Sequence, residues 1–409
     1  MQTINRATLQ NGLRVIHSHD SATTMVALSV IYDVGSADED ATSTGIAHLM
    51  EHLMFGGSVN IPSFDREIER AGGTDNAWTS TDLTCYYDVM PAHNVETAFW
   101  LESDRMISPA FSLKSLEVQK GVVIEEFKQQ FLNRPYGMLN HLIRATAYKT
   151  HPYRWPVIGL TPDHVAAVTL EDVKNFYFSH YTPSRAVLSV CGNISWDKTL
   201  RLAEKWFAQI PDRRTKLRSL PVEAIPDSPR HAETSGNVPS TLISVNFPMP
   251  GLDSPDYIPA DILSDVLGTG TSSILYDRLV RSTGIFHTID ASIDGSRDPG
   301  LLHITGKLRN GIEPKDAYDA VFEETTRLVS SGVDEIMLMR AVNMFESART
   351  LENLGCLPRC LDMGQNEIYG RKSDVVMEKY LSLVPEDVNR AARLILNPLR
   401  ATKITFIPC

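Results

Sequence analysis

Residues 45–57 read GIAHLMEHLMFGG, and this stretch decides how the first part of the chain folds. Its apolar residues, among them Leu49 and Leu53, recur at the spacing of a helix that buries one face. Ser43 or Thr44 can cap the start of this helix, and the two glycines at its end can stop it. We therefore expect a short amphipathic helix over the middle of the stretch.

His48 and His52 are four residues apart on this helix, so both imidazoles project from one face, one turn apart. Glu51 lies close to the same face. Two histidines can hold a zinc ion when at least one further side chain completes the site, and a nearby carboxylate can take a proton from water. The pattern indicates metal-assisted hydrolysis, although two histidines at this spacing also occur on helices that bind no metal.

The segments around the helix carry the patterns of both strands and helices. Residues 13–17, 25–34 and 81–89 are rich in apolar and β-branched residues, which predicts strands. Residues 94–106 and 113–131 return to helical periodicity. Because strands and helices mix without strict alternation, the sequence predicts an α+β fold with helices packed on a largely antiparallel sheet.

The chain contains one internal repeat. The run ALSV at 27–30 is echoed by LISV at 242–245, and EDV at 171–173 is echoed at 386–388, both with an offset of 215 residues. Two separate matches with one offset indicate a duplicated unit. We therefore expect two homologous domains of the same α+β type.

The predicted domain boundaries follow from this repeat. We expect a metal-binding domain at 1–210, a linker at 211–230 and a homologous domain at 231–409. Prolines and charges suit an exposed linker, although the same residues could form a long surface loop inside one domain. At the offset of 215, the second domain carries aliphatic residues in place of the two histidines and the glutamate: Leu263, Val266 and Leu267.

Composition excludes several classes of protein. The 409 residues are 43% hydrophobic and 22% charged, which is typical of a folded protein with two cores and excludes disorder. A net charge of −11 argues against a nucleic-acid partner, and the absence of a long apolar run argues against a membrane-spanning helix. The five cysteines form no C-x-x-C pair, so we expect reduced thiols. The first residues lack the pattern of a secretion signal, so we expect a cytoplasmic location.

Five segments resemble one known family. These are the expected strand at 25–35, GIAHLMEHLMFGG at 45–57, AGGTDNA at 71–77, TDLTCYY at 81–87 and KGVVIEE at 120–126. They are similar to the inverted-motif (HxxEH) zinc peptidases, which include pitrilysin, insulin-degrading enzyme and the mitochondrial processing peptidase. The resemblance implies a zinc-dependent endopeptidase that cleaves peptides or unfolded segments. The two-domain layout fits the short subunits of this family.

The resemblance also implies roles for individual residues. His48 and His52 match the family's metal ligands, and Glu51 matches the general base that takes a proton from water. The third ligand is the second glutamate of a pair on a later helix, here Glu126, which lies 74 positions after His52. Glu125 is the alternative, and adjacent helical residues point about 100° apart, so only one of the two can face the metal.

Further residues of the site match the family less closely. Gln119 stands where many members have a glutamate that supports the metal, but it could equally be a solvated helix residue. Asn76 and Ala77 match an edge strand to which an extended substrate adds, and a turn before a strand is the alternative. Arg281 and His287 resemble a substrate-binding arginine and tyrosine with one residue deleted between them, and a structural use of both is the alternative.

The family layout also predicts a partner. Members enclose their substrate between four such domains, so a two-domain chain should form a homodimer or pair with a homologous subunit. The alternative function is a non-catalytic structural or peptide-binding subunit of a heteromeric complex, like the core subunits of the respiratory bc1 complex. Zinc is the expected metal, although manganese or cobalt can occupy similar sites.

Overall fold

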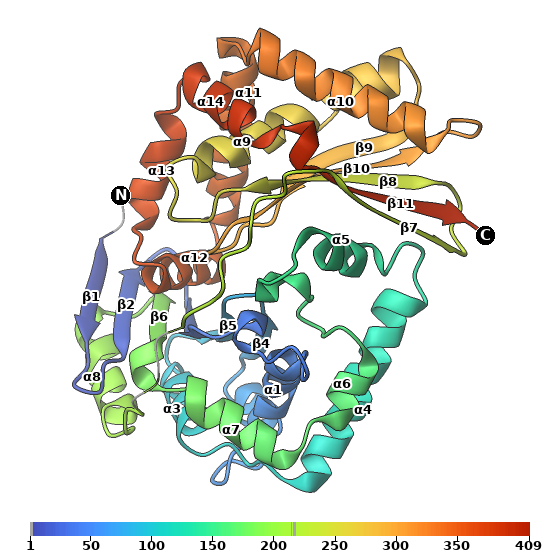
Figure 1. Ribbon diagram of the computed structural model, residues 1–409. Coiled ribbons are helices and arrows are strands. Elements are labelled where there is room, and N and C mark those ends of the chain that lie inside the picture. The colour runs from blue at the N-terminus through green and yellow to red at the C-terminus, as the bar shows by residue number, and fades with distance from the viewer. Residues whose placement is uncertain (1–2, 214, 216–217) are drawn as a thin grey trace. The chain divides into compact units, whose positions relative to one another are not determined.

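A computed structural model describes residues 3–213, 215 and 218–409 (Figure 1). The chain forms two compact units that interleave along the sequence. The first unit contains Met1–Phe127, Trp155–Ser219 and Arg349–Val375, and the second contains Lys128–Arg154, Leu220–Ala348 and Val376–Cys409. The contiguous domains expected from the sequence differ from these units, because 128–154 belongs to the second unit and 349–375 to the first.

The first unit is built on a six-stranded sheet with the order β1-β2-β6-β3-β5-β4. Its strands are β1 (Ile4–Thr8), β2 (Arg14–His19), β3 (Met25–Tyr32), β4 (Thr74–Thr79), β5 (Thr84–Pro91) and β6 (Ala186–Gly192). All neighbouring strands are antiparallel except β2 and β6, which are parallel. Strand β4 is an edge strand, so one side of its backbone has no partner within the sheet.

Helices surround this sheet. They are α1 (Ile46–Met54), α2 (Phe64–Arg70), α3 (Glu96–Ile107), α4 (Leu113–Phe127), α6 (Pro162–Ala167), α7 (Leu170–His180), α8 (Trp196–Phe207) and α12 (Cys356–Ile368), with short 3-10 turns η1 (Ser36–Asp38) and η4 (Pro183–Arg185). Helix α12 packs on one face of the sheet because its buried residues, among them Cys360 and Met363, contact an apolar set that includes Ala27 and Ile31. The hydroxyl of Ser189 donates a hydrogen bond to the carbonyl of Cys360 at 2.7 Å. This packing explains why 349–375 belongs to the first unit.

The second unit has a five-stranded sheet with the order β7-β11-β8-β10-β9. The strands are β7 (Arg230–Gly236), β8 (Leu242–Met249), β9 (Phe286–Ile293), β10 (Gly300–Leu308) and β11 (Thr402–Pro408). Its helical segments are η2 (Lys128–Leu132), α5 (Leu139–Ala147), η3 (Pro152–Arg154), α9 (Tyr257–Gly268), η5 (Tyr276–Ser282), α10 (Pro314–Ser331), α14 (Pro385–Ile395) and η6 (Pro398–Arg400). Helices α11 (Glu335–Glu352) and α13 (Ser373–Leu381) each run from one unit into the other along the chain.

The two sheets repeat one topology. The strand order β2-β6-β3-β5-β4 of the first unit corresponds to β7-β11-β8-β10-β9 of the second, and the one parallel pair, β2 with β6, corresponds to β7 with β11. Helices α7 and α14 lie 215 residues apart, the offset found in the sequence. The predicted α+β fold with two homologous, largely antiparallel domains is confirmed.

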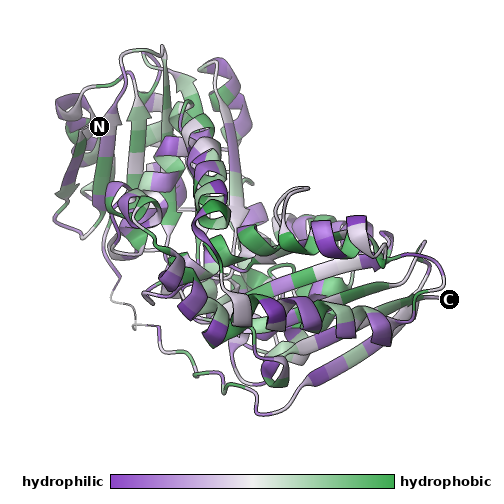
Figure 2. Ribbon diagram, turned by 90° about the horizontal axis from the view of Figure 1, so that it is seen from above, coloured by the Kyte–Doolittle hydropathy of each residue, from purple (hydrophilic) through white to green (hydrophobic). Residues whose placement is uncertain are grey.

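The hydropathy pattern matches this layered arrangement. Figure 2 shows hydrophilic and hydrophobic residues alternating along the helices, as expected for amphipathic helices that cover a sheet. Within the described part of the chain, no helix combines the length and the apolar character that are needed to span a membrane.

Two glycines on helices test how tightly helix and sheet approach each other. A methyl group at Gly268 of α9 would collide with the backbone nitrogen of Ala291 on β9, whereas one at Gly121 of α4 would meet nothing within 4 Å. Gly268→Ala should therefore lower the thermal unfolding midpoint by about 5–10 °C. Gly121→Ala should raise it by about 1–3 °C, because alanine favours the helix. Differential scanning calorimetry of both variants checks the expected opposite signs, and equal midpoints would contradict this packing.

Candidate metal centre

Helix α1 carries most of the candidate site, and its first turn differs from the sequence-based expectation. The cap residue of the helix is Gly45, whose φ of 92° lies in the left-handed region. A glycine has no side chain that could accept a hydrogen bond from the first turn. The prediction that Ser43 or Thr44 caps the helix is wrong. The Thr44 hydroxyl instead contacts Nδ1 of His164 at 2.8 Å and accepts the N–H of Leu160 at 2.9 Å.

Three side chains from two helices converge beside α1. The rings of His48 and His52 are 4.8 Å apart between centroids and lie nearly edge to face. Glu126, from α4, places Oε2 at 3.8 Å from Nε2 of His48 and 3.5 Å from Nε2 of His52. One ligand atom from each of the three residues falls within 4.8 Å of the others, the only such group of three or more in the described residues.

This donor set suits a small divalent cation. Two ligands held about 2.0–2.1 Å from a tetrahedral zinc ion lie roughly 3.4 Å apart, close to the separation of His52 and Glu126. Nε2 is the nitrogen of His48 that faces Glu126. The other ring nitrogen, Nδ1, is buried without a hydrogen-bond partner among the described residues. Two imidazoles and one carboxylate leave room for a water molecule in a four-coordinate site.

The charges of the three side chains favour metal binding. Burial, together with the neighbouring His52, lowers the pKa of His48 to about 4, so this imidazole is neutral at physiological pH. A hydrogen bond from His52 and the proximity of both histidines hold the pKa of Glu126 below its usual value. Neutral imidazole and ionised carboxylate are the forms that bind a metal, so no proton has to be removed from either residue first.

Glu51 lies on the same helix in a different environment. Its side chain is buried, and this burial raises the pKa of Glu51, while a hydrogen bond from Thr79 pulls the pKa down. The donor is the Thr79 hydroxyl of β4. His52 and Glu126 also act on the pKa of Glu51: His52 lowers it and Glu126 raises it. A carboxyl with a raised pKa next to a metal site is suited to accept a proton from water.

The glutamate pair on α4 points in two directions. Glu126 faces the histidines, with 35% of its side chain exposed, and Glu125 lies on the exposed side of the helix. Gln119 lies on the same helix, two turns before Glu126, and is half-buried. Glu126 rather than Glu125 lies beside the histidines, and the ligand role of Glu126 and the supporting role of Gln119 stay predictions.

Asn76 and Ala77 lie on β4, the edge strand that also carries Thr79. The side chain of Asn76 is exposed, and its Oδ1 accepts the N–H of Ala77 at 2.8 Å. Both residues pair with β5 on one side, opposite Tyr87 and Tyr86. The other side of this strand has no strand partner within the sheet, and the binding of substrate there stays a prediction.

Arg281 and His287 belong to the other compact unit. Arg281 lies on η5, and its guanidinium forms an exposed ion pair with Asp277 at 3.1 Å. His287 lies on β9, the edge strand of its sheet, and is exposed. Both residues are exposed within the second unit. Their binding of substrate stays a prediction.

Two residues near the site were not identified from the sequence. Thr79 is separated from Glu51 by 28 positions, so only the folded chain brings them together. Glu39 precedes α1, and its carboxylate accepts the N–H groups of Gly45 and Ala47. The sequence offers only an indirect indication of Glu39. A helix that is capped by a glycine has no capping side chain of its own, so its first N–H groups need acceptors from elsewhere.

Two family models match the chain. The model described as Insulinase (Peptidase family M16) matches residues 14–160, which include α1, α4 and β4. The model described as Peptidase M16 inactive domain matches residues 167–345. Together they match residues of both compact units but leave out 346–409.

Curated relatives carry related descriptions. The chain is 33% identical to the zinc protease PqqE of Helicobacter pylori over 279 residues, which are 67% of this chain and 63% of that protein. It is 27% identical to an uncharacterized zinc protease of Mycobacterium leprae, over 96% of this chain and 89% of the relative. It is 26% identical to a probable mitochondrial-processing peptidase subunit beta of Arabidopsis thaliana, over 89% of this chain and 70% of the relative.

Solved structures share the fold. A protease from Helicobacter pylori superposes with a TM-score of 0.92 at 24% identity, and all of both chains is covered. The periplasmic protease PqqL from Escherichia coli superposes with a TM-score of 0.81 at 17% identity, over 100% of this chain and 48% of that chain. The present chain therefore corresponds to about half of PqqL in fold.

The two glutamates of α4 offer a matched pair of variants. Glu126→Gln should weaken zinc binding at least about tenfold, because the amide offers a neutral and poorer ligand beside the two histidines. Glu125→Gln removes the same charge one residue away, on the exposed side, and should leave zinc affinity within about twofold. Chelator competition on the metal-free proteins measures both affinities. Weaker binding in the Glu125 variant alone would reverse the ligand assignment.

Proposed function

The chain belongs to the M16 family of insulinase- and pitrilysin-like peptidases, and on this premise we propose that it is a zinc-dependent endopeptidase. The convergence of His48, His52 and Glu126, with Glu51 on the same helix, carries the proposal. The relatives that are named zinc proteases support the choice of metal.

His48, His52 and Glu126 would hold the zinc ion. Once bound, zinc would supply a Lewis acid that lowers the pKa of a water molecule and polarises the scissile carbonyl. Glu51 takes the proton of the attacking water and later gives it to the amine that leaves when the C–N bond breaks. Thr79 orients the Glu51 carboxylate through its hydrogen bond.

An extended peptide fits the open side of β4. A substrate strand added there exchanges main-chain hydrogen bonds with the backbone around Asn76 and Ala77, so it is held largely independently of its side chains. This arrangement favours unfolded peptide segments as substrates, because a folded domain rarely offers an unpaired strand. Arg281 and His287 stay proposed substrate-binding residues on the ground of the sequence resemblance.

A second chain is the proposed partner. The Arabidopsis relative is named as a subunit, and the chain corresponds to about half of PqqL. We therefore expect two copies of this chain, or this chain and a homologous subunit, to enclose the substrate together.

A non-catalytic structural or peptide-binding subunit is the second candidate, and one observation favours it. Residues 167–345 match the inactive domain of the family. This segment contains α9, where the fully buried residues Leu263, Val266 and Leu267 stand in place of the motif, and it does not include α1 or Glu126. The match therefore describes the part of the chain that follows the candidate site, and it leaves the endopeptidase as the better-supported function.

Glu51→Gln separates metal binding from catalysis. The amide cannot accept the proton of water, so we expect kcat to fall by about 10²–10⁴-fold while zinc content stays at the wild-type level. Glu69→Gln, an exposed carboxylate on α2, serves as the charge-matched control. Hydrolysis of a quenched fluorescent peptide and metal analysis of the same samples give both numbers. Full cleavage by the Glu51 variant would remove the assigned base, and zinc without any wild-type cleavage would favour the second candidate.

Strand addition to β4 predicts a periodic response to backbone methylation of the substrate. In an extended peptide, successive N–H groups point to opposite sides, so only alternate ones can reach β4. Methylating those N–H groups one at a time should weaken binding about 3- to 10-fold, and methylating the intervening ones should change it little. Binding is measured by fluorescence anisotropy on the Glu51→Gln protein, which does not consume the peptide. A response without the two-residue period would rule out this mode of binding.

A further inference from the structure

The first turn of α1 carries a proposed metal ligand, and its backbone N–H groups need hydrogen-bond acceptors from outside the helix. His48 is the third residue of the helix, and the N–H groups at the start of a helix have no acceptor within the helix itself. A helix end without a cap frays. Fraying here would move His48 directly, and Glu51 and His52 follow one turn later.

The side chains at the start of the helix do not accept hydrogen bonds from these N–H groups. Gly45, the cap residue, has no side chain, and the Thr44 hydroxyl is occupied by His164 and Leu160. The glycine itself is required, because its φ is positive and a Cβ would lie 2.8 Å from the carbonyl oxygen of Ile158. The caps must therefore come from another part of the chain.

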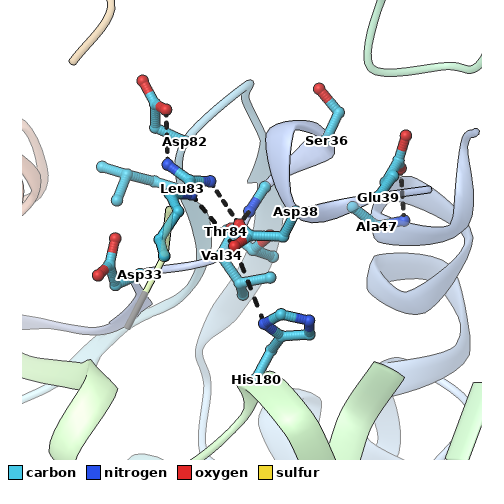
Figure 3. Close-up of polar contacts among 12 residues, drawn as sticks. Asp33, Val34, Ser36, Asp38, Glu39, Ala47, Asp82, Leu83, Thr84 and His180 are labelled. Carbon is cyan, nitrogen blue, oxygen red and sulfur yellow. Dashed lines mark hydrogen bonds and ion pairs between the residues drawn. The ribbon is translucent and has the colours of Figure 1, made fainter. Parts of the chain in front are cut away.

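Glu39 supplies them. Its Oε2 accepts the N–H of Gly45 at 3.0 Å and its Oε1 accepts the N–H of Ala47 at 2.9 Å, so each oxygen bonds one backbone group of the first turn. Figure 3 shows the Glu39 side chain beside Ala47. Glu39 is 7% exposed; burial raises the pKa of Glu39, while the two N–H donors act in the opposite direction and favour the ionised form, in which both oxygens accept.

The turn that carries Glu39 is itself firmly anchored. The Asp38 carboxylate, 4% exposed, receives Nε of Arg218 at 3.1 Å, and the same guanidinium reaches Asp82 at 2.8 Å. Nδ1 of His180 lies 3.9 Å from Oδ1 of Asp38 (Figure 3). The guanidinium of Arg185 lies 3.6 Å from the same oxygen. An exposed surface loop would not hold a helix cap in place, whereas a buried turn with paired charges can.

The same turn also holds the strand that orients the proposed base. The N–H groups of Ser36 and Ala37 donate to the carbonyls of Ser80 and Thr81 at 3.1 and 2.8 Å, directly after β4 ends at Thr79. One turn, residues 36–39, therefore contacts both α1 and the end of β4. These are the two elements that supply Glu51 and its hydrogen-bond donor.

From this arrangement we infer that Glu39 is a positioning residue for the metal centre: it fixes the first turn of α1 and thereby sets His48 and Glu51 relative to Glu126. The inference rests on the proposed function, because it assigns Glu39 to the assembly of a zinc site. Glu39 acts through the backbone of α1 and touches neither substrate nor metal.

The test uses the isosteric variant Glu39→Gln in the full chain. The amide keeps one acceptor oxygen and places an NH₂ group opposite one of the two N–H donors, so half of the cap is lost. We expect the zinc dissociation constant to rise at least about tenfold, measured by chelator competition. The absorption spectrum of the cobalt-loaded protein should change as well, because the ligand geometry is altered.

Thr169→Ala is the matched control. Thr169 caps α7 of the same unit through a capping box with Asp172, and α7 carries no residue of the candidate site. This variant should lower the thermal midpoint of the metal-free protein while zinc affinity stays within about twofold of wild type. If Glu39→Gln behaves in the same way, with lower stability and unchanged zinc affinity and cobalt spectrum, Glu39 is only a structural cap and the inference is overturned.

Hydrogen exchange on the wild-type chain gives a second measurement that needs no folded variant. In the metal-free protein, the amides of Gly45 and Ala47 should be protected, and zinc should slow their exchange further because ligand binding and the first turn are coupled. Exchange of these amides at the rate of an unprotected chain, or without response to zinc, would overturn the inference. A wild-type chain that binds no zinc at all identifies a failure of the proposed function instead.

Discussion

The contact between α1 and α4 is the constraint on which the candidate site depends. In the proposed zinc site, two imidazoles one turn apart on α1 define a narrow region for the third ligand, and the proposed third ligand comes from another helix. Packing of α4 beside α1 places Glu126 there and leaves Glu125 outside. A rotation of α4 by one residue, about 100°, would exchange these two side chains, so the packing between the helices determines which glutamate faces the histidines.

Three buried carboxyl groups of the first unit, those of Glu51, Glu39 and Asp38, each have specific polar partners. Glu51 receives the hydroxyl of Thr79, and Glu39 receives two backbone N–H groups. Burial alone would raise the pKa of Asp38, but the paired Arg218 holds this pKa below its usual value. Uncompensated charges at such depth would cost several kcal/mol each, about the total stability of many domains. We therefore expect that removing one polar partner of such a carboxyl group would lower the stability of the first unit by a large amount.

The duplicated architecture shows that the fold does not by itself create the site. Both units use the same strand order, and in both a helix follows the central strand. In α1 this helix carries two histidines and a glutamate, whereas α9 has buried aliphatic side chains at the corresponding positions. The aliphatic helix can pack by hydrophobic burial alone, without the polar partners that α1 requires.

The sequence by itself determined the α+β fold, the duplication and the pairing of His48 with His52, because strand periodicity, repeat offset and helical spacing are local properties of the chain. It favoured Glu126 but could not exclude Glu125, since the rotation of a helix against its neighbour depends on packing. It placed the cap of α1 at Ser43 or Thr44, although the Thr44 hydroxyl has other partners once the chain folds. Only the tertiary structure decided that Thr79 bonds Glu51 and that Glu39 caps the start of α1. Their contacts join separate elements, and no local pattern encodes which distant side chain will reach an unsatisfied hydrogen-bonding group.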